Sequence, residues 1–377
     1  MRARVPVMAL TAAASAGVAI FFTLYSLIPV TRGEEAGLSS LFAGTMMVFV
    51  MGVQVFTPAL VRRFSLRGVL IASLLVLAAG ALLTGIASGT AALLAGAVAS
   101  GSGFGVLIVA GAQGVALLVP PGRLGRALGT YGLVTMASSA LGSPAGLHIA
   151  LTFSSQVFGV CAVAAGLIAA VASLGVPPGV GKAGTSTPAS ASGPRGVPAL
   201  VSGAPWLVLA VLLVAVVLLS HGLSSLPVLA AAHGSAAVTV FAVQVGNALG
   251  RGIGGELEAR ITTRATLIAG VLLLAAGGAL GVATGGQGAV ITAGALIGLG
   301  VGIVQTVTLH TAMRRMDSGR ASVVWNLAVD GGLWAGGVLW GIAIASGFVV
   351  AGALVLSVLL LGITAVAVLR LPGHGDR

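Results

Sequence analysis

The sequence predicts an all-α membrane protein with twelve transmembrane helices in two pseudo-symmetric six-helix halves. Three observations predict it: the composition, the spacing of the charges and an internal repeat. The chain is 58% hydrophobic and 7% charged, whereas about a quarter of the residues in soluble domains are charged. A soluble domain of 377 residues has too little interior to hide so much apolar surface, so the composition indicates a chain that lies in lipid.

Charged residues occur in tight clusters, and the runs between the clusters set the helix count. Three uncharged runs, 68–122, 127–181 and 196–250, contain 55 residues each. One crossing needs about 20 apolar residues, because a helix rises about 1.5 Å per residue through about 30 Å of hydrocarbon. Each run therefore fits a helical hairpin. We expect helices at 6–30, 38–61, 68–87, 91–118, 126–150, 154–176, 205–230, 236–257, 265–284, 288–313, 320–345 and 348–369.

The cations predict which side of the membrane each loop occupies. Of the 18 Lys and Arg residues, only Arg32 lies outside the segments that share one side in this arrangement. Because cytoplasmic loops are rich in Lys and Arg, we expect a multi-pass protein of the plasma or inner membrane with both termini in the cytoplasm. The stretch Met1–Val30 is too long for the core of a signal peptide and predicts a retained first helix. The net charge of +11 marks loops rather than a surface for nucleic acid.

The chain divides into an N-terminal half (1–176), a linker (177–204) and a C-terminal half (205–377). The linker is rich in Pro, Gly, Ser and Thr without periodicity, which predicts a flexible cytoplasmic connection. The segment that ends at Arg67 returns at Arg264, an offset of 197 residues, and the segment around Arg126 returns around Arg320, an offset of 194. These offsets predict a duplicated unit with a substrate site at the interface of the repeats.

At these segments the chain resembles the major facilitator superfamily of transporters. The signature of that family between helices 2 and 3 is Gly-x-Leu-Ala-Asp-Arg-x-Gly-Arg-Arg, and an echo lies between helices 8 and 9. The segment Leu141–Gly146, which contains Pro144, is similar to a motif of the exporters in this family. Leu60, Arg63 and Arg67 match the first copy, and Gly255, Leu257, Arg260 and Arg264 match the second.

The resemblance implies a set of gating residues and also shows two departures. The signature Asp is Arg62 in the first copy and Ala259 in the second, so the gate must use other contacts. A buried Arg on helix 4 is usual in proton-coupled exporters, and Ala97 stands there. The expected gating residues are Arg62, Arg63, Arg67, Pro144, Gly255, Arg260 and Arg264.

Polar side chains inside the predicted spans are the candidates for substrate binding or coupling. Asp330 is the one acidic case, about 15 Å along its helix, and an ionisable residue at such depth is a functional hypothesis by default. The alternative is an ion pair or backbone contact that only holds helices together. Asn326 shares a face with Asp330, and Gln244 and Asn247 form one stripe with Arg251. Substrate contact and an interhelical hydrogen bond both stay open for Gln54, Gln113 and Gln305. His221 is a coupling group or a packing residue, and Tyr25 is a cavity hydroxyl or an interfacial aromatic.

We therefore expect a monomeric secondary transporter in the lipid bilayer that moves a small, amphipathic organic molecule by alternating access. Efflux of a drug-like compound or metabolite, with protons as a candidate coupling ion, is the first choice. Uptake of a sugar or metabolite, a non-transporting sensor and a membrane-embedded enzyme are the alternatives. We expect no enzyme activity, cofactor or metal, because no Walker motif, HExxH motif or acidic cluster is present. The single cysteine, Cys161, has no metal-ligand neighbours in the sequence.

Overall fold

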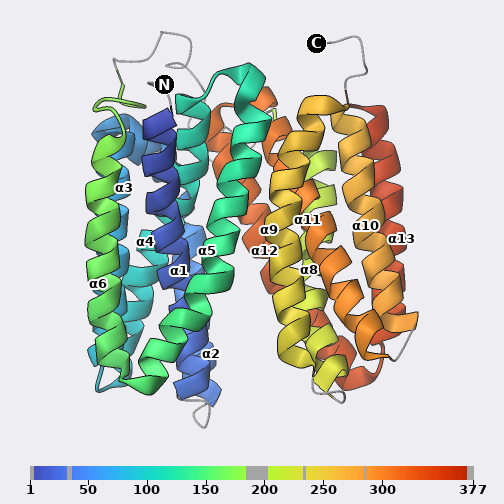
Figure 1. Cartoon of the computed structure of the whole chain (residues 1–377), viewed down its shortest axis with the longest axis horizontal. Coiled ribbons are helices and arrows are strands. Elements are labelled where there is room, and N and C mark those ends of the chain that lie inside the picture. The colour runs from blue at the N-terminus through green and yellow to red at the C-terminus, as the bar shows by residue number, and fades with distance from the viewer. Residues whose placement is uncertain (1–3, 32–35, 184–202, 232–234, 284–285, 372–377) are drawn as a thin grey trace. The chain divides into compact units, whose positions relative to one another are not determined.

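The protein is described by a computed structural model over residues 4–31, 36–183, 203–231, 235–283 and 286–371. Twelve α-helices cover this part of the chain (Figure 1), which confirms the predicted class and helix number. The helices are α1 (Arg4–Thr31), α2 (Ala36–Gln54), α3 (Thr57–Ile86), α4 (Thr90–Leu118), α5 (Leu124–Thr152), α6 (Ser155–Ala172), α8 (Trp206–Ala231), α9 (Ala236–Arg260), α10 (Thr263–Ala283), α11 (Gln287–Arg315), α12 (Ser318–Ser346) and α13 (Val349–Leu369).

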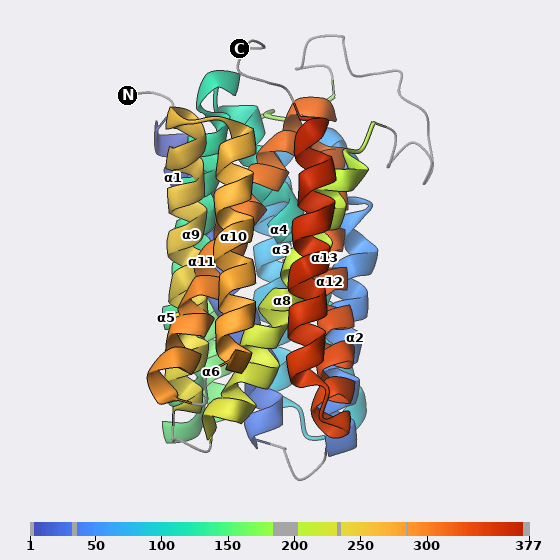
Figure 2. The same ribbon diagram turned by 90° about the vertical axis from the view of Figure 1, so that its right-hand side faces the viewer.

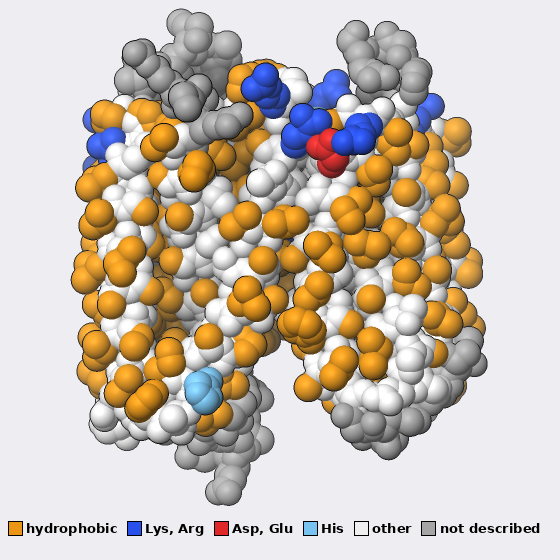
Figure 3. Space-filling view, viewed as in Figure 1, with side chains coloured by type: hydrophobic (Ala, Val, Ile, Leu, Met, Phe, Trp, Pro, Cys, Tyr) orange, Lys and Arg blue, Asp and Glu red, His pale blue; other side chains and the backbone are white. Residues whose placement is uncertain are grey.

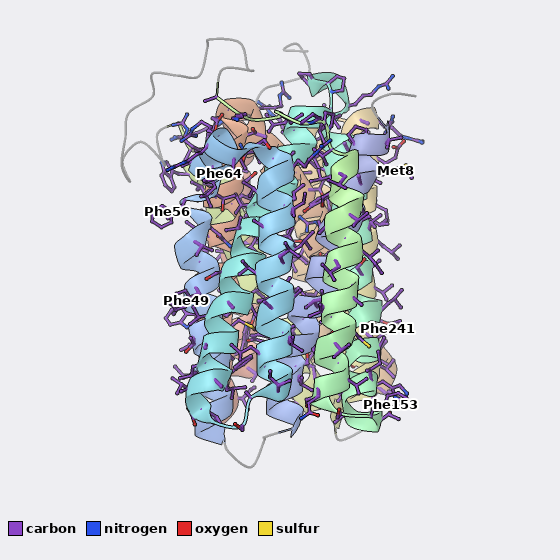
Figure 4. All side chains as sticks on the ribbon, turned by 90° about the vertical axis from the view of Figure 1, so that its left-hand side faces the viewer. Met8, Phe49, Phe56, Phe64, Phe153 and Phe241 are labelled. Carbon is purple, nitrogen blue, oxygen red and sulfur yellow. The ribbon has the colours of Figure 1, made fainter. Side chains whose placement is uncertain are left out.

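The helices have the length and surface of membrane spans. Ten of those described are long and apolar enough to cross a membrane, and α2 adds a shorter apolar segment, Leu41–Gln54. Large apolar side chains point outward from the bundle, for example Phe56 with 63% of its surface exposed and Phe153 with 70% (Figure 4). On the face shown in Figure 3 hydrophobic side chains, in orange, are spread along the helices of each unit, and the Lys and Arg side chains lie at the helix ends. The protein is thus a multi-pass membrane protein.

The junction of the second and third helices differs most from the sequence prediction, which began the third helix at residue 68. The second helix was expected to run to residue 61, but α2 ends at Gln54 and α3 begins at Thr57. Pro58 occupies the first turn of α3, where its missing N–H costs no hydrogen bond. The helix is then interrupted at Ser65, whose backbone has φ 73° and ψ 157°. A short helical piece therefore precedes the membrane span in α3.

The chain folds into two compact units whose boundaries lie inside two helices. Unit 1 contains 1–120, 138–200 and 317–326, and unit 2 contains 121–137, 201–316 and 327–377. The first half of α5 thus belongs to unit 2 with most of the C-terminal sequence, and the start of α12 belongs to unit 1. Each unit combines one sequence half with the beginning of one helix from the other half.

Close glycine contacts hold the helices of unit 1 together. A Cβ added to Gly101 of α4 would lie less than 3.0 Å from the carbonyl oxygen of Met46 in α2. Gly105, one turn later, faces the carbonyl oxygen of Val50 in the same way. On the opposite side of α4, Gly103 lies against the backbone of Leu77 in α3. Such small residues let membrane helices approach until their backbones touch.

Unit 2 repeats these contacts at a constant offset of 197 residues. Gly298 of α11 faces the carbonyl oxygen of Val243 in α9, and Gly302 faces that of Asn247. On the other side of α11, Gly300 lies against the backbone of Leu274 in α10. Both partners of every contact shift by the same number of residues. This agreement confirms the two pseudo-symmetric halves.

An arginine fastens the last helix of each half to the loop that carries the repeated signature. Arg67 donates through Nε to the carbonyl oxygen of Val176 at 2.5 Å and through Nη2 to that of Leu174 at 2.8 Å. Its counterpart in the repeat, Arg264, donates to the carbonyl oxygen of Leu371 after α13. Guanidinium groups stabilise helix C-termini because the last carbonyl groups carry partial negative charge. We call the end of each unit where these arginines lie its cationic end.

The beginning of the predicted linker is ordered rather than free. Leu66 N–H donates to the carbonyl oxygen of Val180 at 2.8 Å, and Ala183 N–H donates to that of Arg62 at 2.9 Å. The linker was expected to be flexible throughout, but these bonds attach its first residues to α3. Its remaining residues, 184–202, lie outside the described part of the chain.

Candidate functional site

Tyr25 lies at the edge of an aromatic cluster in unit 1. Its ring stacks on Phe21 of α1 with centroids 6.4 Å apart, and Phe21 in turn stacks on Phe104 of α4 at 3.7 Å. Tyr25 keeps 42% of its surface exposed, whereas Phe21 keeps 3%. The cluster thus presents one accessible ring with a phenolic hydroxyl on a buried, rigid aromatic base.

The three candidate amides of unit 1 are all buried. Gln54 is the last residue of α2 and is fully buried, so it lies at a helix end rather than within a span as expected. Gln113 of α4 packs against the start of α12, because a Cβ on Gly319 would lie 2.9 Å from Gln113 Nε2. Asn326 of α12 donates through Nδ2 to the carbonyl oxygen of Ser322 at 2.8 Å, within its own helix.

Two candidate amides of unit 2 carry oxygens without a hydrogen-bond partner among the described residues. Asn247 of α9 and Gln305 of α11 each keep 3% of their surface exposed, and neither Asn247 Oδ1 nor Gln305 Oε1 accepts a bond. Gln244, one turn before Asn247 in α9, is half-buried. A buried amide oxygen without a donor costs about 1–3 kcal/mol. These two oxygens are therefore available to a donor that the folded chain itself does not supply.

His221 lies in the seam between α8 and α12. It is fully buried, and its ring centroid is 4.4 Å from that of Trp340 at an interplanar angle of 35°. Trp340 Nε1 donates to the carbonyl oxygen of Val217 at 2.8 Å, whereas neither ring nitrogen of His221 has a hydrogen-bond partner among the described residues. Its present surroundings are those of a packed side chain.

Asp330 lies near the middle of α12, a helix of 29 residues. It follows Ser318 by twelve positions, which corresponds to about 18 Å along the helix axis. The side chain is half-buried, and nearby Gly332 packs against Val216 of α8. Asp330 belongs to unit 2 and Asn326, one turn earlier, to unit 1, so the helix changes its packing partners between the two candidates.

The second signature copy binds the start of α5 within unit 2. A Cβ on Gly255 of α9 would lie 2.8 Å from the carbonyl oxygen of Gly125, so the two backbones are in contact. Beside this contact Glu256 accepts from Nε of Arg126 at 2.7 Å and from Nε of Arg260 at 2.8 Å. The acid thus joins α5 and α9 and also neutralises an expected gating residue.

A second acid of the same copy, Glu258, is buried two residues after Glu256. Glu258 Oε1 lies 2.9 Å from His310 Nδ1 of α11 and accepts from the hydroxyl of Thr263 at 3.0 Å. The side chains of Glu258 and His310 are only 5% and 13% exposed. His310 corresponds to Gln113 at the offset of 197, and each lies beside the first glycine of a helix that begins there, Gly125 or Gly319.

Arg251 extends the α5–α9 contact toward the interior of unit 2. It is 7% exposed, and a Cβ on Gly132 of α5 would collide with its guanidinium group. Its backbone carbonyl accepts from the hydroxyl of Thr306 in α11 at 3.0 Å. The glycine in α5 therefore makes room for the one buried arginine of this helix group.

Sequence reasoning did not single out Glu256 and Glu258, although it required substitutes for the missing signature Asp. The signal was present, because both acids lie within the three residues before Ala259, which stands where that Asp is expected. In the first copy Ala59 and Val61 occupy the equivalent positions. The acids therefore stand in the second copy alone, whereas Arg62 and Arg63 of the first copy are exposed.

Pro144 lies inside α5, which stays helical around it. The segment before it packs on α1: Thr23 donates to the carbonyl oxygen of Gly142 at 3.3 Å, and Ser143 donates to that of Phe22 at 3.1 Å. Proline removes one helical hydrogen bond and permits bending. Among the described residues no three His, Cys, Asp or Glu side chains form a group that could hold a metal ion.

Comparison with known proteins agrees with this architecture. The family model of the Major Facilitator Superfamily matches residues 7–337. Two crystal structures of the fucose:proton symporter FucP are similar in fold. One, a variant of the Escherichia coli protein, has a TM-score of 0.79, and the other, in the outward conformation, has 0.75; each is 16% identical, and each alignment covers 99% of this chain and 100% of that chain. No curated protein matches the sequence.

Proposed function

Because the chain belongs to the Major Facilitator Superfamily, we propose that this membrane transporter exports an uncharged or mildly cationic amphipathic molecule by alternating access. The observation that carries the proposal is the set of polar side chains in the described spans away from the cationic ends: buried amides, hydroxyls, the imidazole of His221 and the half-buried carboxylate of Asp330. Phosphate or dicarboxylate substrates would require a cluster of cations. The one buried arginine, Arg251, is packed against α5.

Recognition of the substrate combines stacking with hydrogen bonding in this proposal. The exposed ring of Tyr25 offers an aromatic face on the rigid base of Phe21 and Phe104. The free oxygens of Asn247 and Gln305 accept from hydroxyl or amine groups. In unit 1 the aromatic ring suits the apolar face of an amphipathic molecule, and in unit 2 the two amide oxygens suit a molecule with one or two hydrogen-bond donors. Asn326 acts as a structural amide in this proposal, since it donates to the carbonyl oxygen of Ser322 in its own helix.

The α5–α9 contact acts as the gate in this proposal. Glu256 takes the place of the signature Asp, because it pairs with Arg126 and Arg260. Arg67 and Arg264 fasten the ends of each half, and Pro144 lets α5 bend near the point where it passes from unit 2 to unit 1. We also propose that the cationic ends face the cytoplasm, as the positive-inside tendency predicts.

Asp330 couples transport to protons in this proposal, since it is the one carboxylate within the described spans away from the cationic ends. The test uses proteoliposomes and a substrate selected by thermal-shift screening. We expect Asp330→Asn to abolish accumulation driven by a pH gradient but to keep substrate counterflow, which needs no net proton movement. Glu256→Gln, which weakens the gate, should change both rates together. Accumulation by Asp330→Asn at the wild-type level would refute coupling through this residue.

Uptake of a sugar with protons is the second candidate, because the similar structures are those of a fucose:proton symporter. The exporter-like segment around Pro144 favours export. The same proteoliposomes decide between them. Vesicles that contain a proton-coupled exporter accumulate substrate when protons flow out of them. Vesicles that contain a symporter accumulate substrate when protons flow in. Chemical conversion of the substrate would indicate an enzyme, and binding without flux would indicate a sensor.

A further inference from the structure

An apolar groove runs between α10 and α13 in unit 2. Its volume is about 200 Å³, and Figure 2 looks onto the face where the two helices lie side by side. Three of its side chains are partly exposed along the groove: Ile268 by 40%, Leu272 by 53% and Leu361 by 39%. Both helices are membrane spans, so the groove opens toward lipid. Val271, Thr364, Ala365 and Val368 complete its walls.

Arginines surround the end of this groove. Arg264 precedes Ile268 by one helical turn, so both lie on the same face of α10. Arg370 follows Val368 of α13 by two residues and is exposed. Arg315 donates to the backbone carbonyl of Arg370 at 3.3 Å, which brings a third guanidinium group to this end. Within the described residues no ion pair neutralises these three arginines, because the acids of unit 2 at this end bind Arg126, Arg260 and His310.

A guanidinium can still donate while it holds the helix end. Arg264 uses Nε and Nη2 for the carbonyl oxygen of Leu371, and the Nη1 donors remain for an anion, since a guanidinium carries five N–H groups. Arg370 is held through its backbone, so its side chain is not committed by that bond. The apolar groove therefore ends beside guanidinium groups, which bind phosphate well.

We propose that this groove binds an anionic glycerophospholipid, with one acyl chain between α10 and α13 and the phosphate headgroup at Arg264 and Arg370. A free phosphate compound would leave the apolar walls without a partner, and a neutral lipid would leave the charges without one. Basic pockets between membrane helices at the cytoplasmic surface are suited to anionic headgroups. The proposal does not depend on the substrate, the coupling ion or the direction of transport.

The repeat explains why unit 2 has space here. In unit 1 the equivalent pair is α3 and α6, where Gly166 lets α6 approach α3 until a Cβ would lie 2.7 Å from the Cβ of Ala78. The residues that Arg67 and Arg264 hold, Val176 and Leu371, define an offset of 195 between α6 and α13. At that offset Leu361 replaces Gly166. A leucine keeps α13 away from α10 and itself forms part of the groove wall.

The test is native mass spectrometry of the full chain in detergent, with added phosphatidylglycerol or phosphatidylcholine of the same acyl chains. We expect one phosphatidylglycerol to be retained at least tenfold more strongly than phosphatidylcholine. Arg370→Gln should weaken phosphatidylglycerol binding about fivefold, since one arginine near the membrane surface contributes about that factor. Ala365→Trp should fill the groove and prevent retention of either lipid.

Arg123→Gln is the matched control, because Arg123 is also an exposed arginine of unit 2 and lies on the short turn before α5. It should bind phosphatidylglycerol as the wild type does. Equal retention of both lipids by the wild type would overturn the proposal, and so would an equal loss in Arg123→Gln and Arg370→Gln. Should Ala365→Trp fail to fold, Arg370→Gln and its control carry the test alone.

Discussion

Ser65 shows why the family signature has glycine at this position. Its φ of 73° with ψ of 157° lies in a region that is almost restricted to glycine. In the family signature the corresponding position is Gly, and Ser65 replaces it in this chain. The backbone turns there between the short helical piece of α3 and its membrane span. The signature glycine is therefore needed because this backbone conformation excludes most side chains, and not because a neighbouring helix packs closely against it.

We predict that Ser65→Gly stabilises the protein. The substitution removes backbone strain of about 1–3 kcal/mol, against which stand the greater freedom of glycine in the unfolded chain and a hydrogen bond from Gly68 N–H at 3.4 Å. A net gain of about 1 kcal/mol should raise the apparent Tm in a thermal-shift measurement.

Ser65→Ala is the control, since it loses the same hydrogen bond but keeps the Cβ that causes the strain. Its Tm should be equal to or below that of the wild type. A rise in Tm for Ser65→Ala as large as for Ser65→Gly would show that the hydroxyl group, rather than the backbone, is the source of the effect.

Partners of polar residues could not be predicted from the sequence. Gln113 was a candidate from the sequence, but its position beside Gly319 appears only when α12 is placed. Asn326 was a candidate for the substrate, yet its amide binds its own helix. A polar side chain in an apolar span predicts that it has a hydrogen-bond partner. Which residue is that partner depends on the helix that packs beside it.

At the scale of helices, the glycines determine how closely α9 and α11 pack. Gly250 of α9 faces the carbonyl oxygen of Leu299 in α11, and Gly298 faces that of Val243 in α9. The seam is thus lined with glycine from both sides. In unit 1 the glycines come from α4, because Val53 stands where α9 has Gly250. The pair α9 and α11 therefore has glycine contacts from both helices, whereas in the equivalent pair, α2 and α4, they come from α4 alone.

We predict that Gly298→Ala destabilises the protein strongly. The new Cβ would collide with a backbone carbonyl that has no flexible end to move, so α9 and α11 must separate; overpacking of this kind costs about 1–3 kcal/mol or more. The expected result is a clear fall in the apparent Tm and in the yield of folded protein.

Gly337→Ala is the matched control in another membrane helix. A Cβ at Gly337 of α12 meets no atom within 4 Å, and alanine favours the helix by up to about 1 kcal/mol. Its Tm should equal or exceed that of the wild type. Similar losses for both variants would mean that glycine acts through helix propensity or flexibility, not through close approach.

At the scale of the whole molecule, the two units reproduce one contact pattern with one asymmetry. The glycine contacts recur at an offset of 197, and the contact of Arg67 with Val176 recurs between Arg264 and Leu371. The acids Glu256 and Glu258, in contrast, have no acidic counterparts in the first copy. A duplicated scaffold can keep its packing and change its charges, because packing is constrained by backbone contact and charges at the helix ends are not. We infer that the second copy carries the ionic part of the gate.

We predict that the two ends of α4 lie on opposite sides of the membrane, with the cationic end inside. In a Cys161→Ser background, Ser88→Cys before α4 should react with a membrane-impermeant maleimide on intact cells. Arg123→Cys, after α4, should react only once the cells are permeabilised. The reverse pattern would invert the orientation, and labelling of both on intact cells would contradict a membrane-spanning α4.

The sequence by itself determined the fold class, the number of helices and the duplication, because the need to place apolar residues in lipid fixes the length and spacing of every span. It also identified the polar residues whose burial requires an explanation. Tertiary structure decided the partners: the pairing of Glu256 and Glu258 with Arg126, Arg260 and His310, the seam that encloses His221 and the order at the beginning of the linker. Those contacts join residues from helices far apart in the chain, and the free energy of such a contact depends on distances that no local pattern encodes.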